Sequence, residues 1–176
     1  MTDTATRAEP EQRRAVLKSL RAPRVLVTAV IAVLLLGALA WTGLQLREHL
    51  AVESARADAQ EAAKRYATDL STYDYRHLDS GFATVTAHAE GQFAEQYKQV
   101  SASLTELIRQ NQAVSQGTVL TTAVVSADED HAVVALFVDQ KITNKNTPEP
   151  RVDRNRMQMT LTHDNNRWLI TNIQLL

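Results

Sequence analysis

The run from Val25 to Leu46, VLVTAVIAVLLLGALAWTGLQL, contains no ionisable residue and constrains the rest of the chain more than any other feature. At 1.5 Å per residue, a helix of this length spans about 33 Å, close to the roughly 30 Å of a bilayer hydrocarbon core. Backbone groups in lipid must satisfy one another, and a single run can do this only as a helix. The sequence therefore predicts one transmembrane helix over residues 25–46.

The charges on either side of this run predict its orientation. Five basic residues lie shortly before it and two lie shortly after it: Arg13, Arg14, Lys18, Arg21 and Arg24, against Arg47 and Arg56. Since Lys and Arg beside a membrane span favour the cytoplasmic side, we expect residues 1–24 to form a cytoplasmic basic tail. The chain from Arg47 onward is then expected outside the inner (plasma) membrane.

Other interpretations of the N-terminal part stay open at this stage. The triplet Ala38-Leu39-Ala40 has the small-x-small form of a signal-peptidase site, which would make the run a cleaved signal peptide. A buried core helix of a soluble protein is a further alternative. Within the tail, Glu11–Leu20 is either an amphipathic helix on the lipid surface or a disordered segment that only sets topology.

Composition excludes several functions for the outer region. The chain has no cysteine, which excludes disulfides, thiol catalysis and zinc-thiolate sites. Residues 47–176 hold 13 basic and 17 acidic side chains, and this mildly acidic balance gives no electrostatic basis for binding nucleic acid. No two histidines have i,i+4 spacing on a predicted helix, so we expect neither a metal site nor a cofactor.

Helical periodicity continues beyond the membrane segment. Small and aromatic residues recur at spacings of three or four on one stripe: Val52, Ala55, Ala59, Ala62, Tyr66, Leu70 and Tyr73. A juxtamembrane helix over residues 47–73 is therefore expected to continue into the outer domain, whose remainder is residues 74–176. The alanine-rich stripe either packs on its own domain or forms an oligomer seam.

The next part of the chain also favours helices. Ser71–Phe82 is expected to form a turn and a short helix, and Ala83–Gln116 a helix that Gly91 divides and Gly117 ends. After Gly117 the pattern changes to the alternation typical of strands. Four strands are predicted, namely Thr118–Ser126, His131–Ile142, Val152–His163 and Arg167–Leu175, with a proline-containing loop over Thr143–Arg151.

Helices followed by an antiparallel meander predict an α+β domain with the helices packed on a curved sheet. This arrangement matches the cone-shaped fold of the nuclear transport factor 2 (NTF2) and ketosteroid isomerase superfamily, on fold-level grounds.

More specifically, Val25–Leu176 resembles the Mce-associated membrane proteins of actinobacterial cell envelopes. The features that carry the resemblance are the anchor, the Ala-rich helix leading to Tyr73-Asp74-Tyr75 and Leu78-Asp79, the strand end Val138-Asp139-Gln140, the proline loop before Arg151, and Trp168-Leu169-Ile170. The resemblance implies a membrane-tethered accessory partner of an Mce-type lipid or sterol transporter, without catalysis.

Three functional hypotheses follow for the outer domain. The first is a non-catalytic scaffold that binds envelope proteins, with the basic residues Arg151, Arg154 and Arg156 as a candidate partner surface. The second is a lipid- or sterol-binding module whose cone interior is lined by Tyr73, Tyr75, Phe137, Met159 and Trp168. The third is an enzyme that uses Asp74, His77 or Asp79 as an acid or base; the alternative for these aspartates is that they cap a helical turn.

Overall fold

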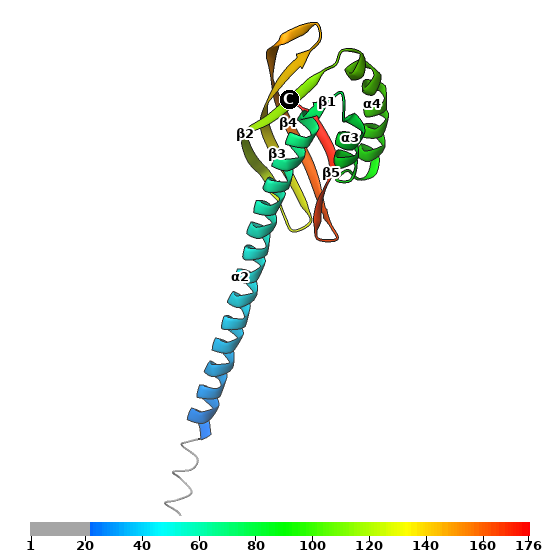
Figure 1. Cartoon of the computed structure of the whole chain (residues 1–176). Helices are drawn as coiled ribbons and strands as arrows, with labels where there is room; N and C mark the ends of the chain where they lie inside the picture. The colour runs from blue at the N-terminus through cyan, green and yellow to red at the C-terminus, as the bar shows by residue number, and fades with distance from the viewer. Residues whose placement is uncertain (1–21) are drawn as a thin grey trace, which may run out of the picture. The chain divides into compact units, whose positions relative to one another are not determined.

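A computed structural model describes residues 22–176 (Figure 1). The predicted tail therefore lies largely outside the described residues. The chain divides into two compact units at Glu48/His49. Helix α2, Ala22–Ser71, supplies the described part of the first unit and the beginning of the second.

The apolar part of α2 is long and apolar enough to cross a membrane. Its most apolar 18-residue window has a mean hydropathy of 2.2, and none of that window is buried. Large side chains such as Leu35 and Trp41 are exposed, which is unlike the core helix of a soluble domain. The helix has the length and composition expected of a single-pass anchor.

The second unit is a five-stranded antiparallel sheet with helices on one side. The strands are β1 (Tyr73–Asp74), β2 (Val114–Ala127), β3 (His131–Asn144), β4 (Thr147–Asp164) and β5 (Arg167–Leu175), in sheet order β1-β2-β3-β4-β5. Helices α3 (Leu78–Thr86) and α4 (Gly91–Gln110) connect β1 to β2. Figure 1 shows α3 and α4 lying near β5. The α+β architecture predicted from the sequence is thus confirmed.

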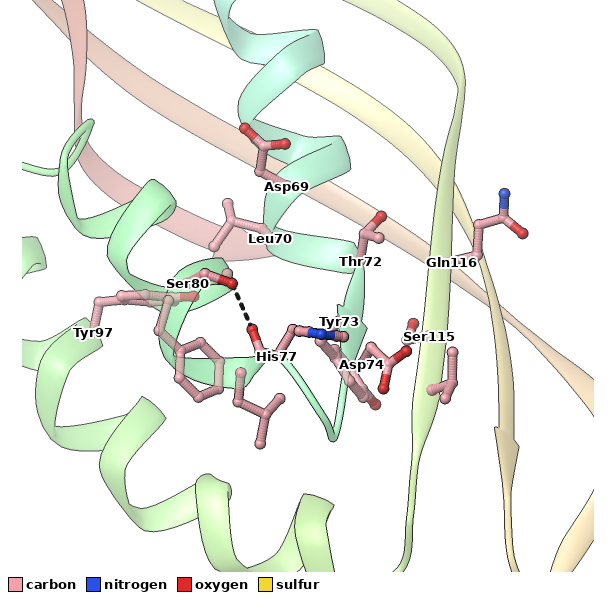
Figure 2. Close-up of a pocket in the computed structure, with 14 residues that line it drawn as sticks. Asp69, Leu70, Thr72, Tyr73, Asp74, His77, Ser80, Tyr97, Ser115 and Gln116 are labelled. Carbon is pink, nitrogen blue, oxygen red and sulfur yellow. Dashed lines mark hydrogen bonds between the residues drawn. The ribbon is translucent and has the colours of Figure 1, made fainter.

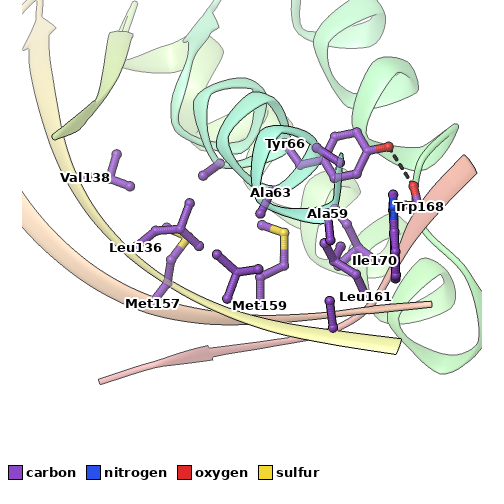
Figure 3. Packing of buried hydrophobic residues seen from close by; sticks show 14 residues of the cluster. Ala59, Ala63, Tyr66, Leu136, Val138, Met157, Met159, Leu161, Trp168 and Ile170 are labelled. Carbon is purple, nitrogen blue, oxygen red and sulfur yellow. Dashed lines mark hydrogen bonds between the residues drawn. The ribbon is translucent and has the colours of Figure 1, made fainter. Parts of the chain in front are cut away.

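The core forms where α2 lies on the sheet. Ala59, Ala62, Ala63 and Ala67 of α2 are buried against a continuous layer of strand residues: Val134, Leu136, Val138, Met157, Met159, Leu161 and Ile170 (Figure 3). Because alanine is short, the helix axis can approach the sheet closely and bury these side chains. The alanine stripe therefore packs on its own domain, as the first of the two interpretations predicted.

The structure corrects three boundaries. The helix expected through Gln116 ends at Gln110, and Gln112 adopts a positive φ of 49° in the turn before β2. Gly117 lies inside β2 rather than ending a helix. The loop expected over Thr143–Arg151 is wrong, since β3 and β4 continue to a tight turn in which the side chain of Asn144 accepts hydrogen bonds from two backbone N–H groups at 2.8 Å.

The loop was predicted because of Pro150, since the sequence does not show which side of a strand the backbone of this proline faces. In an antiparallel ladder, the backbone groups of alternate residues face the same side. The Arg156 carbonyl accepts a bond from Leu176 N–H on the β5 side, so the backbone of Pro150 also faces that side. β5 pairs only with Met157–Asp164, and the missing N–H of Pro150 therefore costs no ladder hydrogen bond.

Several contacts hold the end of α2 to the sheet. The Ser71 carbonyl accepts hydrogen bonds from Ser115 Oγ at 2.7 Å and from Gln140 Nε2 at 3.2 Å. The Gly117 N–H donates to Thr72 Oγ1 at 3.1 Å. A Cβ atom on Gly117 would overlap the Cβ atom of Ser71, so glycine is required for this close approach.

We expect Gly117→Ala to lower the free energy of unfolding by about 1–3 kcal/mol, because the added methyl group forces α2 away from β2. Chemical denaturation of the full chain in detergent measures this change. Gly81→Ala is the matched control, since a Cβ atom at Gly81 meets nothing within 4 Å. Equal stability of the two variants would contradict the role given to Gly117.

Candidate functional site

The first candidate site is a recess of about 460 Å³ beside the C-terminal end of α2 (Figure 2). We call it the Tyr97 recess. It is lined by Asp69 from the end of α2, Thr72 directly after that helix, Asp74 from β1, and Tyr97 from α4, with further residues from α3 and β2. Its volume lies within the range of small-molecule sites.

Two carboxylates in or near the Tyr97 recess, Asp74 and Asp79, are held by arginines. Asp74 accepts hydrogen bonds from the Arg76 backbone N–H and Nε, both at 2.9 Å. These bonds lower the pKa of Asp74 to about 2. Asp79 pairs with Arg109 at 3.0 Å. Both contacts are those of structural ion pairs, because the carboxylates are engaged by cations of their own chain.

Tyr97 differs from its neighbours because its hydroxyl has no hydrogen-bond partner within residues 22–176. Its ring packs edge-on against Phe82, with ring centroids 6.2 Å apart. Burial alone raises the pKa of Tyr97 to about 12. The hydroxyl is therefore a neutral group available to a bound molecule or to water.

The second candidate site is a recess of about 490 Å³ on another part of α2, which we call the His88 recess. Tyr66 stacks on His88 with ring centroids 4.7 Å apart, and His163 stacks on Trp168 at 4.9 Å. Tyr66 donates a hydrogen bond to the Trp168 carbonyl at 2.6 Å. Arg65, Arg167, Asp58 and Glu61 complete its wall, so charges of both signs surround the aromatic groups.

The His88 recess could not be found from the sequence. His88 and His163 are 75 positions apart, and β5 brings them to the same part of α2: its Ile170 N–H donates to the His88 carbonyl, and its Trp168 pairs with His163. The Nδ1 atom of His88 is buried without a hydrogen-bond partner in the described chain. Neither recess assembles a metal site, because residues 22–176 contain no group of three or more His, Cys, Asp or Glu side chains that could hold an ion.

The five residues expected to line a common interior do not share one cavity. Tyr73 and Tyr75 both pack on the small cluster formed by Leu78, Ile108 and Ala113, and Tyr73 also lines the Tyr97 recess. Met159 and Trp168 belong to the main core, where Met159 is fully buried. Phe137 corrects the prediction most clearly: it is 47% exposed, because alternation along β3 places it on the face away from α2.

The three arginines expected to form one surface are also divided by alternation. Arg151 lies an even number of positions from the core residue Met157, hence on the same face of β4, and it pairs with Asp153 at 2.7 Å. Arg154 and Arg156 lie on the opposite face of β4. The Arg156 guanidinium is 5.8 Å from the centre of the Phe137 ring. Only Arg154 and Arg156 therefore share the outer face of the sheet.

Tyr66 and Tyr97 allow a paired test of the hydroxyl environments. We expect Tyr66→Phe to lower the free energy of unfolding by about 1–2 kcal/mol, because it leaves the buried Trp168 carbonyl without its donor. Tyr97→Phe removes a hydroxyl that bonds to nothing in the described chain, and we expect it to leave stability unchanged or higher. Urea titrations of both full-length variants measure this difference, and a larger loss for Tyr97→Phe would refute the assignment.

A pH titration tests the Asp74–Arg76 pair. The depressed pKa predicts that the pair stabilises the fold above about pH 4 and loses this contribution as the pH falls toward 2. Arg76→Ala should raise the pKa of Asp74 toward its ordinary value of 3.8, and carboxyl NMR would record the shift. The Arg76 backbone N–H remains in this variant, so part of the depression should persist. An unchanged pKa in the variant would show that the guanidinium does not set it.

The sequence matches proteins of mycobacteria. The model of a family described as "Uncharacterized protein Rv1363c/MT1408-like" matches residues 22–175. Rv1362c, described as an uncharacterized protein of Mycobacterium tuberculosis, is 31% identical over 97% of this chain and 81% of its own length. Rv1973 of the same species, described as an outer membrane protein, is 31% identical over 68% of this chain and 75% of its own length.

The fold also matches solved structures. The crystal structure of an IcmL-like type IV secretion system protein from Legionella pneumophila superposes with a TM-score of 0.59. The match covers 69% of this chain and 91% of that one, at 12% sequence identity. A likeness at this identity concerns the fold alone, and it supports the NTF2-like architecture predicted from the sequence.

Proposed function

Since the chain belongs to the Rv1363c/MT1408-like family, we propose that it is a single-pass membrane protein whose outer domain is a non-catalytic accessory or scaffold subunit in the cell envelope. The observation that carries this proposal is α2. Between Val27 and Leu46 it is uncharged and its large apolar side chains are exposed, while its alanine face, from Ala59 to Ala67, forms part of the core of the folded unit. One helix thus supplies both the anchor and a structural element of the domain.

The orientation that we propose follows from the charges beside the anchor. The basic residues before Val25 remain in the cytoplasm, and the domain lies outside the inner membrane. Two comparisons support an envelope location: Rv1973 is described as an outer membrane protein, and the IcmL-like protein as part of a type IV secretion system.

The partner that we propose is an Mce-type lipid or sterol transporter. The support is the resemblance of Val25–Leu176 to the Mce-associated membrane proteins. The lipid-binding alternative is less well supported because side chains fill the interior between α2 and the sheet: Leu136, Met159 and Leu161 are at most 1% exposed. An enzymatic role is likewise not favoured, since Asp74 and Asp79 are paired with arginines.

Topology and partner are tested together in native membranes. Protease added to intact spheroplasts should digest residues 49–176, and cross-linking followed by mass spectrometry should recover transporter subunits with the full chain. Asp74→Ala, His77→Ala and Asp79→Ala should leave the cellular phenotype unchanged. If the domain is protected from protease, the proposed orientation is wrong. If the protein purifies without any partner in mild detergent, the accessory role is wrong. A changed phenotype of the alanine variants would favour an enzyme.

A further inference from the structure

The His88 recess differs from the Tyr97 recess in its charged side chains. In or near the Tyr97 recess, Asp74 and Asp79 each pair with an arginine. The His88 recess contains four charged side chains, and none of them forms an ion pair with another described residue: Asp58, Glu61, Arg65 and Arg167. Glu61 and Arg65 have the i,i+4 spacing that favours such a pair, yet they do not make it. These charges therefore remain available to a bound molecule.

The charges of the His88 recess are separated by sign. Asp58 and Glu61 precede Arg65 on the same face of α2 by seven and four residues, which corresponds to about 10 Å and about 6 Å along the helix. Burial raises the pKa of Tyr66, and the positive charges of Arg65 and Arg167 oppose this rise, so both guanidinium groups lie near the Tyr66 hydroxyl. The recess thus has an acidic end and a basic end.

His88 adds an uncharged donor to the recess. Its Nδ1 is the only buried side-chain nitrogen or oxygen without a hydrogen-bond partner in residues 22–176. A neutral imidazole carries one N–H, and an unpaired buried N–H donor is less well tolerated than an unpaired buried acceptor. The proton is therefore assigned to Nε2, which also forms no hydrogen bond in this part of the chain and is accessible in the recess.

This arrangement of charges selects a molecule that carries both signs. A simple anion bound between the two arginines would lie close to the carboxylates of Asp58 and Glu61, and a simple cation at these carboxylates would lie close to the guanidinium groups. A zwitterion satisfies both ends. A phosphate fits the basic end better than a carboxylate, because two bidentate guanidinium groups use all four acceptor sites of a carboxylate and leave none for the His88 Nε2–H.

We propose that the His88 recess binds a phosphorylated primary amine, with its phosphate between the two arginines and its ammonium group at the two carboxylates. A small compound of this kind is ethanolamine phosphate, whose bridge of two carbons and one ester oxygen is comparable in length to the single helical turn between Glu61 and Arg65. The recess volume of about 490 Å³ also accommodates larger molecules with the same two groups.

The same two groups occur in a soluble metabolite and in the head group of a lipid. If the source is a lipid, its acyl chains remain outside the core, because side chains such as Leu136 and Met159 fill the interior between α2 and the sheet. All residues of the recess belong to the unit His49–Leu176. The site goes beyond the accessory role proposed above and does not depend on it.

Titration of the full chain with ethanolamine phosphate tests the site. The chain is purified in an uncharged maltoside detergent, and NMR follows the indole N–H signals of its two tryptophans. We expect a saturable shift of the Trp168 signal, since Trp168 lines the recess. Trp41 lies in the uncharged run of α2 and serves as the internal reference, whose signal should not move. An unchanged Trp168 signal, or equal shifts of both signals, would overturn the proposal.

Variants that remove one charge test each end of the recess. Arg167→Gln and Asp58→Asn should each weaken the binding of ethanolamine phosphate roughly tenfold or more, because each removes a hydrogen bond to a charged group. Arg154→Gln is the matched control on the outer face of the sheet and should bind as the unchanged chain does. All three side chains are exposed and form no ion pair in the described chain, so we expect the variants to fold.

Inorganic phosphate and ethanolamine separate a zwitterion site from a site for one charge. Each should bind more weakly than ethanolamine phosphate, and Asp58→Asn should not weaken the binding of inorganic phosphate. If inorganic phosphate binds as tightly as ethanolamine phosphate, or if Asp58→Asn has no effect on either compound, the recess is a simple anion site and the proposal is wrong. Equally tight binding of ethanolamine alone would contradict it in the same way.

Mixed micelles distinguish the two sources of the ligand. Phosphatidylethanolamine in the maltoside detergent should shift the Trp168 signal if the site takes a lipid head group, whereas phosphatidylglycerol, which has no amine, should not. A shift with the soluble compound alone assigns a soluble ligand, and both of these results support the proposal. An equal shift with phosphatidylglycerol would refute it. None of these outcomes changes the accessory role, which the cross-linking in native membranes tests.

Discussion

The structure depends on the close approach of α2 to the sheet. This approach requires small residues on both sides: alanines from Ala59 to Ala67 on the helix, and Gly117 on β2. It also requires partners for the backbone at the end of the helix, which Ser115 and Gln140 supply by donating to the Ser71 carbonyl. Because the same helix begins as an apolar anchor, the packing of its second half determines where the folded unit is attached.

The interior between α2 and the sheet is filled by side chains. Leu136, Met159 and Leu161 fill the space that a cone-shaped domain could offer to a ligand. The two recesses lie elsewhere: the Tyr97 recess is beside the C-terminal end of α2, and the His88 recess is beside the Asp58–Tyr66 part of the same helix.

Local patterns predicted the elements well where one periodicity dominated. The alanine stripe and the alternation of Met157, Met159 and Leu161 appear as expected, because each reflects a face buried by its own element. The division at Gly91 also appears, since Gly91 adopts a positive φ of 57° where α4 begins. The prediction of a loop around Pro150 was wrong, because the missing N–H of a proline costs a ladder hydrogen bond only where it faces a paired strand. Gly117 was misplaced because its small size serves contact with Ser71, which is distant in sequence.

The sequence alone determined the anchor, the sign of the charges beside it and the α+β class, since these depend on runs and periods within single segments. Tertiary structure decided which side chains share a face or a recess. It placed Phe137 and Arg156 together on the outer face and separated them from Arg151, although Phe137 had been expected to line the interior and the two arginines to share one surface. It also decided which strand edge stays open, because the pairing of β1, β4 and β5 depends on how far each strand extends along its neighbour.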